Sequence, residues 1–285
     1  MSKFLDDCIA MVREQPFDII RISEYKDGKI ETAEYLSANP CQNTYSVAKT
    51  FTMTAIGMLW DRGLISLDEK VCEILADELP AEGMDERWYT NTVEMVLTHR
   101  SGLPGGFLDI DTTPATDFGE NYLEYMFRYP MAYTPGEEQR YSDGAFYLLS
   151  RIAAKKAGEP MDNFLWRELF YPMGFREMAW SHCPHGHPMG ATGLYIRSDD
   201  MVKLGALYLQ GGEYGGRRYL SEEWVRAAME NDYAIDCDEE KKIFFKGGMF
   251  GQKLIIHPEG GRAVALQAFG ANSDVIADFV KNYKE

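Results

Sequence analysis

The stretch that decides the fold is a polar loop that runs into an apolar helix: residues 39–60 read NPCQNTYSVAKTFTMTAIGMLW. The apolar run from Phe51 onward predicts a helix over Val47–Arg62, which places Ser46 at its N-terminus. A serine there usually caps the helix, but capping favours Glu or Gln three residues later and disfavours a cation in the first turn. Lys49 breaks this pattern. Residues three apart share a helix face, with Cβ atoms about 5–6 Å apart, so the amine of Lys49 can reach the Ser46 hydroxyl and activate it as a nucleophile without histidine.

A second motif, Tyr141-Ser142-Asp143, follows the turn signal Pro135-Gly136 and precedes a predicted helix over Gly144–Ala157. This position places Tyr141 on a loop, where its hydroxyl can face a cleft and serve as a general base beside lysines. The alternative interpretation is a tyrosine that covers an edge of the core.

A third motif, Lys246-Gly247-Gly248, ends a predicted strand. Its two glycines let a substrate lie against the backbone, while the lysine supplies a fixed positive charge. The alternative is a solvated lysine at a sheet edge, followed by a turn.

In the order Ser-x-x-Lys, Tyr-Ser-Asp and Lys-Gly-Gly, the three motifs resemble the active-site signature of the penicillin-recognising serine hydrolases. The resemblance is strongest to the class C β-lactamase-like group, which includes related esterases, D-aminopeptidases and D-Ala-D-Ala carboxypeptidases. Residues 97–103 (LTHRSGL) and 190–194 (GATGL) also look like segments of that group. The resemblance therefore runs from about Tyr45 to about Gln252, most of the chain.

The resemblance implies that Ser46 is the acylated nucleophile, that Lys49 and Tyr141 handle its protons, and that Lys246 contributes electrostatically. It places the oxyanion hole at the backbone N–H groups of Ser46 and Met249. No metal or cofactor is required. The residues expected to contact substrate are Asp143, Gly247 and Gly248.

Two of these residues depart from the family pattern. Asp143 replaces the asparagine typical of β-lactamases, and an ionised carboxylate can only accept hydrogen bonds. Gly247 replaces the usual Thr or Ser and so removes a hydroxyl that would bind a substrate carboxylate. Both changes disfavour efficient β-lactam binding. The stretch from Tyr141 to Lys246 is also short for a class C enzyme, which favours a more open pocket.

The two ends of the chain predict the pieces of one antiparallel sheet with helices. Residues 3–14 and 273–283 have helical spacing, and the predicted strands are 17–23, 29–36, 243–245, 252–257 and 262–269. Between them the pattern is mainly helical, at 47–62, 92–98, 122–129, 144–157, 161–169, 198–210 and 221–231. We therefore expect an α/β (α+β) fold of the β-lactamase/transpeptidase type. Residues 1–48 and 232–285 would form the α/β domain, residues 49–231 an inserted helical domain, and the active site would lie between them.

The composition disfavours two classes of partner, and the small-molecule substrate is what the resemblance implies. A formal net charge of -16 and a pI near 4.8 disfavour nucleic acid and anionic membrane surfaces as partners. Residues 1–15 interrupt their apolar positions with charges, unlike a signal peptide, so we expect a cytoplasmic protein, although a chain with its leader removed would look the same. An odd number of scattered cysteines fits reduced thiols: Cys8, Cys41, Cys72, Cys183 and Cys237.

Two weaker signals have structural explanations. The run His182-Cys183-Pro184-His185-Gly186-His187 offers three imidazoles and a thiol for a metal, but such ligands usually come from separate rigid elements, and the family segment that follows already explains this loop. His99 could touch substrate, although a hydrogen bond within its loop is the more common role.

The leading hypothesis is a serine hydrolase that acts on small esters, amides or D-amino-acid peptides through a Ser46 acyl-enzyme. β-Lactamase or D-Ala-D-Ala carboxypeptidase activity is an alternative within the same enzyme class. From a different class, the chain could be a non-catalytic binding or sensor protein. The intact set of Ser46, Lys49 and Tyr141 argues against that reading.

Overall fold

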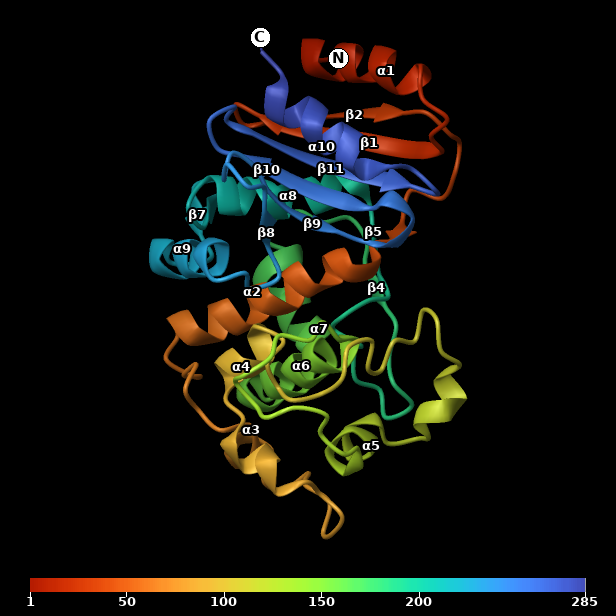
Figure 1. Cartoon of the computed structure of the whole chain (residues 1–285). Helices are drawn as coiled ribbons and strands as arrows, with labels where there is room; N and C mark the ends of the chain where they lie inside the picture. Colours follow the sequence, from red (N-terminus) through yellow and green to blue (C-terminus); the bar gives the residue numbers. More distant parts are fainter. Residues whose placement is uncertain (285) are drawn as a thin grey trace. The chain divides into compact units, whose positions relative to one another are not determined.

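A computed structural model describes residues 1–284 and divides the chain into two compact units. The first unit comprises Met1–Thr50, Leu169–Ala179 and the residues from Leu194 on. The second comprises Phe51–Glu168 and Trp180–Gly193. Figure 1 shows their elements. Among residues 1–284, no helix combines the length and the apolar composition that crossing a bilayer requires.

The first unit is built on a six-stranded antiparallel sheet of order β2-β1-β11-β10-β9-β8 (Figure 1). Both ends of the chain supply its strands, as the sequence predicts: at its centre β1 pairs with β11, with Ile22 opposite Leu266. The strands are β1 (Ile19–Lys26), β2 (Lys29–Glu34), β8 (Asp236–Cys237), β9 (Phe244–Gly247), β10 (Lys253–His257) and β11 (Arg262–Ala268).

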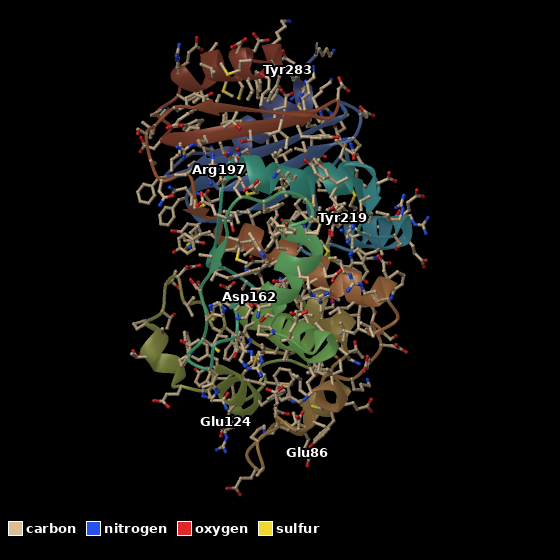
Figure 2. The ribbon with its side chains drawn as sticks, turned by 180° about the vertical axis from the view of Figure 1, so that it is seen from behind. Glu86, Glu124, Asp162, Arg197, Tyr219 and Tyr283 are labelled. Atoms are coloured by element: carbon tan, nitrogen blue, oxygen red, sulfur yellow. The ribbon has the colours of Figure 1, made fainter. Side chains whose placement is uncertain are left out.

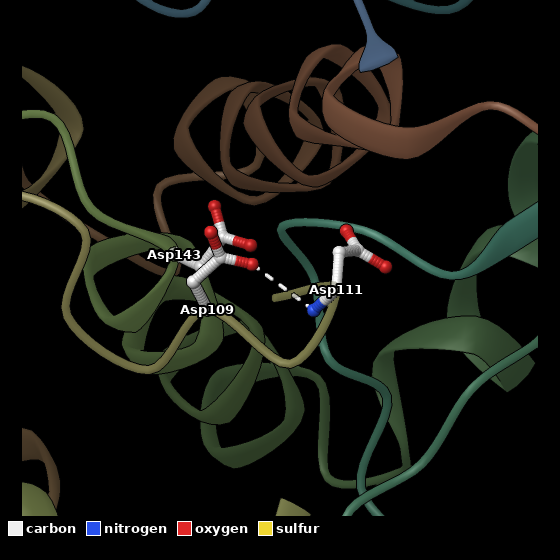
Figure 3. Close-up of side chains that lie close together, drawn as sticks. All are labelled: Asp109, Asp111 and Asp143. Carbon is white, nitrogen blue, oxygen red and sulfur yellow. Dashed lines mark hydrogen bonds between the residues drawn. The ribbon is translucent and has the colours of Figure 1, made fainter. Parts of the chain in front are cut away.

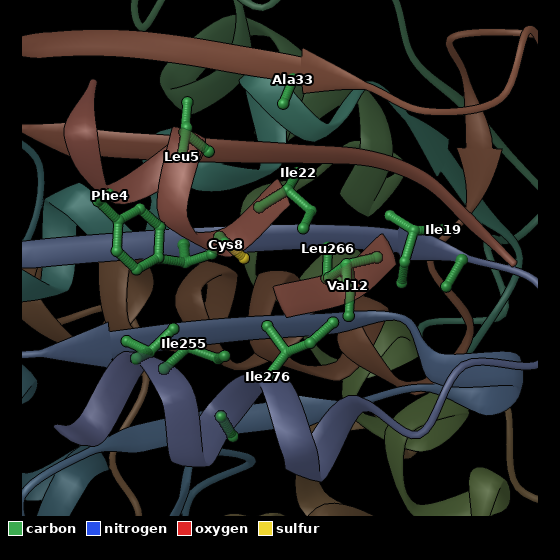
Figure 4. Packing of buried hydrophobic residues seen from close by; sticks show 14 of the residues in the cluster. Phe4, Leu5, Cys8, Val12, Ile19, Ile22, Ala33, Ile255, Leu266 and Ile276 are labelled. Carbon is green, nitrogen blue, oxygen red and sulfur yellow. The ribbon is translucent and has the colours of Figure 1, made fainter. Parts of the chain in front are cut away.

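Helices cover both faces of this sheet, which explains why β1 and β11 are buried along almost their whole length. On one face, apolar residues of α1 (Lys3–Arg13) and α10 (Ser273–Asn282) join Ile22, Val264 and Leu266 in one core, seen in Figure 4. On the other face α8 (Ser198–Leu209) packs against β1, β10 and β11. A Cβ atom at Gly205 of α8 would lie 2.9 Å from the Cβ of Ala263, so glycine allows this close approach.

A buried ion pair fastens α1 and α10 to the sheet. Arg262 donates from Nε to Glu24 Oε1 at 2.5 Å, and the two side chains are 2% and 3% exposed. The guanidinium of Arg262 also lies over the rings of Phe4 and Tyr283, 4.4 and 5.0 Å from their centroids. Tyr283, labelled in Figure 2, donates in turn to Asp7 Oδ2 at 2.8 Å. The first and last helices are thus joined by direct contacts.

The second unit is helical and centres on α6 (Asp143–Ala157), which is buried from Asp143 to Ala153. Polar side chains cap its helices: Thr92, Asn121 and Ser142 accept from N–H groups in the first turns of α4, α5 and α6. The other elements are α3 (Val71–Ile74), η2 (Glu86–Thr90), α4 (Val93–Leu97), η3 (Ala115–Phe118), α5 (Tyr122–Arg128), α7 (Met161–Leu165) and the π-helical turn η4 (Trp166–Phe170). Helix α2 (Ala48–Asp61) begins in the first unit and continues in the second.

The sequence predicts a helical insertion over residues 49–231, whereas in the structure residues 49–50, 169–179 and 194–231 belong to the first unit. The apolar residues of much of this region have helical spacing, which favours the helical insertion. In the structure the region belongs to the first unit, since α8 packs on the sheet. Very short strands were also missed, because two or three residues show no alternation: β3 (Gln42–Asn43), β4 (Ala179–Trp180), β5 (Leu194–Ile196), β6 (Glu213–Tyr214), β7 (Arg217–Arg218) and β8. Helix α9 (Glu222–Glu230) agrees with its prediction.

His187, in the loop before residue 190, should make the free energy of unfolding depend on pH. His187 lines a cavity of about 540 Å³ with Glu78 and Arg151, and burial, with a smaller effect of Arg151, lowers its pKa to about 4. The unfolded chain, with an ordinary histidine pKa near 6.5, then takes up this proton first. Because His187 is partly exposed and its interactions are screened by solvent, we expect stability to fall by only roughly 1–2 kcal/mol as the pH drops from about 6.5 to about 4. Urea unfolding of His187→Gln should lack this component, while the same change at exposed His185 should retain it.

Candidate active site

Ser46 and Lys49 lie together at the start of α2. Ser46 is in the single 3-10 turn η1 (Tyr45–Val47), which leads directly into the helix. Lys49 Nζ donates to Ser46 Oγ at 3.2 Å, and the Lys49 side chain is completely buried while Ser46 is partly exposed. The spacing predicted from the sequence therefore produces a direct contact between nucleophile and amine. Burial of the Lys49 side chain therefore restricts its amine to a position within hydrogen-bond distance of the Ser46 hydroxyl.

The third motif lies against the segment that carries Ser46. Strand β9 ends at Gly247, and a Cβ at Gly248 would lie 2.4 Å from the carbonyl oxygen of Thr44 and 3.2 Å from the Cβ of Tyr45. Gly248 is therefore needed for backbone packing beside the nucleophile. A Cβ at Gly247 would meet nothing within 4 Å, so that glycine borders open space.

Lys246, in the same strand, is buried and donates from Nζ to Asp236 Oδ2 at 3.2 Å. Asp236 lies in the neighbouring strand β8, which pairs with β9. The positive charge of Lys246 is therefore partly neutralised by a carboxylate that sequence reasoning did not connect with it.

Two backbone N–H groups in this region are available as donors. Among residues 1–284, neither the N–H of Ser46 nor that of Met249 donates a hydrogen bond to another residue. Met249 opens the turn η5 (Met249–Gly251) directly after Gly248. Because Gly248 packs on Thr44 and Tyr45, both N–H groups belong to segments in direct contact. This is the arrangement that the predicted oxyanion hole requires.

The close approach at Gly248 leads to a prediction. Gly248→Ala should force β9 away from Thr44 and misplace the Met249 N–H, because the added methyl would overlap a backbone oxygen. We expect a destabilisation of about 1–3 kcal/mol and a loss of activity of about 10²-fold. Gly247→Ala, whose methyl meets no atom, is the matched control and should unfold like the wild type. Equal melting temperatures for all three proteins would contradict the packing argument.

Tyr141 belongs to the second unit. Its side chain is 45% exposed, and its carbonyl accepts from the Gly106 N–H at 2.9 Å. The ring lies 4.6 Å from that of buried His99, whose Nδ1 accepts from the Ser142 N–H at 3.3 Å. His99 thus has the structural role in its loop that the sequence favoured, and it helps to hold Tyr141. In the sequence, His99 is indicated by the family-like segment at residues 97–103.

Asp143 lies beside two carboxylates that sequence reasoning missed. Figure 3 shows Asp109 and Asp111 of a long loop next to Asp143 at the start of α6, with carboxylate oxygens within 4.8 Å of one another. The Asp111 N–H donates to Asp109 Oδ1 at 3.0 Å, and Thr192 Oγ1 donates to Asp111 Oδ2 at 2.5 Å. Asp143 is therefore part of an acidic group that connects this loop to the segment 190–194.

Across residues 1–284, that acidic group is the only set of three His, Cys, Asp or Glu side chains with ligand atoms this close together. The histidines of 182–187 do not converge. His182 Nε2 pairs with Asp162 Oδ2 at 2.9 Å, while the buried Cys183 sulfur accepts from the Tyr147 hydroxyl at 3.4 Å. These side chains connect the loop to α6 and α7, in line with its structural interpretation.

The chain is similar in sequence to β-lactamase-related proteins. The family model described as Beta-lactamase matches residues 25–279. Penicillin-binding protein 4 of Amycolatopsis lactamdurans is 29% identical over 132 residues, 46% of this chain and 34% of that protein. Lovastatin esterase of Penicillium rubens is 25% identical over 187 residues, 59% of this chain and 46% of that one. The chain thus spans a third to a half of the length of these curated relatives.

Solved structures share the fold at low sequence identity. The crystal structure of a penicillin-binding protein homolog from Caulobacter crescentus matches with a TM-score of 0.76 and 14% identity, over 98% of each chain. The predicted mixed fold, with an antiparallel sheet and helices, is confirmed by this likeness and by the elements described above.

Proposed function

Because the chain belongs to the β-lactamase family, we propose that it is a serine hydrolase that forms an acyl-enzyme on Ser46. The observation that carries this proposal is the 3.2 Å contact between the buried Lys49 amine and the Ser46 hydroxyl. A neutral amine at this distance can accept the serine proton as the hydroxyl attacks.

In the proposed reaction, Ser46 Oγ attacks the carbonyl carbon of an ester or amide and its proton passes to the Lys49 amine, from which Tyr141 relays it to the leaving group. The negative oxygen that develops is stabilised by the N–H groups of Ser46 and Met249, with the charge of Lys246 as a further contribution. The bond to the alcohol or amine then breaks, and the leaving group takes the proton.

Deacylation reverses the roles of the same groups. Water attacks the acyl-enzyme carbonyl and gives a proton to Tyr141 and Lys49, the bond to Ser46 Oγ breaks, and the serine recovers its proton. The products are a carboxylic acid and the regenerated enzyme. Each step conserves protons without any further reactant besides water.

Small esters and amides are the favoured substrates over β-lactams and D-Ala-D-Ala peptides. Gly247 borders open space where a hydroxyl would bind a substrate carboxylate. Asp143 lies with two further carboxylates, so a negative charge near it would be repelled. Lovastatin esterase, among the relatives, carries an ester substrate in its name. These observations support an esterase or amidase more than a penicillin-binding activity.

A covalent probe tests the proposal. A fluorophosphonate should add once, and peptide mass spectrometry should place it on the peptide that contains Ser46, because the neighbouring amine and donors make this hydroxyl the most nucleophilic. Ser46→Ala should take up no label. A panel of p-nitrophenyl esters, D- and L-aminoacyl anilides and nitrocefin then identifies the substrate class. A folded wild type without label or turnover would favour the binding-protein alternative.

A further inference from the structure

Three aromatic side chains next to the nucleophile touch one another in a row, and two of them are exposed. The ring centroid of Tyr45, the residue before Ser46, lies 5.3 Å from that of Phe250, and the ring planes are 63° apart. Phe250 stacks in turn on Phe269, with centroids 4.9 Å apart and planes inclined by 17°. Phe250 and Phe269 are 44% and 62% exposed. We call Tyr45, Phe250 and Phe269 the aromatic platform.

The backbone holds the platform in place in a disfavoured conformation. Tyr45 has φ 47° and Phe250 has φ 58°, in the left-handed region that residues with side chains rarely adopt. The Gly270 N–H donates to the Phe250 carbonyl at 2.9 Å and so joins the segments that carry the two phenylalanines. Strained residues of this kind persist where the surrounding structure fixes them, and they concentrate at ligand sites.

The platform shares its segments with the two proposed oxyanion donors. Tyr45 directly precedes the N–H of Ser46, and Phe250 directly follows Met249. Residues of the platform therefore adjoin, along the chain, both N–H groups that are proposed to bind the substrate carbonyl oxygen. The rings carry no charge, and apolar surface of this extent contributes to binding by leaving water.

We infer that the aromatic platform binds the apolar acyl chain of the substrate, which makes esters of medium-chain or aromatic carboxylic acids the preferred substrate class. The inference rests on the proposed function, because it needs an acyl group attached at Ser46. Phe250 and Phe269 are then residues that determine specificity.

The test is the dependence of kcat/KM on acyl length with a constant leaving group. For p-nitrophenyl acetate, butyrate, hexanoate and octanoate, a fully buried methylene would contribute about fourfold. An open stack covers one side of the chain, so we expect about twofold per methylene and roughly 50-fold from acetate to octanoate. In Phe269→Ala and in Phe250→Ala this ratio should fall to about tenfold or less.

Tyr171→Ala is the matched control, since Tyr171 is an exposed aromatic residue of the same unit outside the platform, and it should keep the wild-type ratio. Should Phe250→Ala fail to fold, the highly exposed Phe269 carries the test. An unchanged ratio in folded Phe269→Ala overturns the inference, as does a wild-type kcat/KM that does not rise from acetate to octanoate. Either result leaves the proposed function standing if Ser46 takes up the fluorophosphonate, whereas absence of label in the wild type defeats both.

Discussion

Lys49→Met should reduce kcat by roughly 10³–10⁴-fold while leaving the melting temperature unchanged or slightly raised. The loss follows from removing the amine that lies 3.2 Å from Ser46 Oγ, a proton acceptor of the proposed reaction. Stability should be kept or raised because the change removes a buried amine, whose protonated form the dipole of α2 would oppose by about 0.3–1 kcal/mol. Methionine keeps the length and the apolar stem, so packing is conserved. Steady-state kinetics and calorimetry on the same preparation measure both effects.

A second buried lysine supplies the control for this experiment. Lys253 is 3% exposed and donates from Nζ to Asp274 Oδ1 at 2.5 Å, so Lys253→Met should lose some stability and keep its turnover. If Lys49 were instead one half of a buried ion pair, its removal would cost about 3–5 kcal/mol. A large fall in melting temperature together with retained activity would therefore refute the catalytic assignment.

Tyr141→Phe should lower kcat by roughly 10²–10⁴-fold without affecting the fold, because the ring is retained and the hydroxyl is on an exposed side chain. If Tyr141 and Lys49 handle the same proton, the double variant should be less than about tenfold worse than the poorer single one. Tyr89→Phe, at an exposed tyrosine of the same unit, should have wild-type kinetics. Losses that multiply would mean that the two side chains act separately.

The parts of the molecule that could be predicted from the sequence are those determined by neighbours along the chain. The Ser46–Lys49 contact follows from helical spacing, and the helices and long strands follow from their apolar periods. The family resemblance is confirmed by the match over residues 25–279. The roles assigned to the site residues stay predictions until the variants above are measured.

The features that could not be predicted depend on contacts between distant segments. Nothing near Asp143 in the sequence indicates that Asp109 and Asp111 lie beside it, and nothing near Gly248 indicates the Thr44 carbonyl. The stacking of Phe250 on Phe269 could not be predicted for the same reason, because the two residues belong to different segments. The positive φ angle of Phe250 could not be predicted either, because aromatic residues rarely adopt the left-handed conformation.

The pairing of β1 with β11 has a consequence for how the chain folds. Ile22 and Leu266 lie opposite each other although about 240 residues separate them, so β1 and β11 cannot pair until the chain has been synthesised to the end of β11. The second unit, drawn mainly from residues 51–168, can begin to form during translation. Until then, the edge of β1 that pairs with β11 has no partner strand, and an unpaired strand edge is prone to aggregation. Refolding in the test tube should be slow for the same reason, since such distant contacts carry a large entropic barrier.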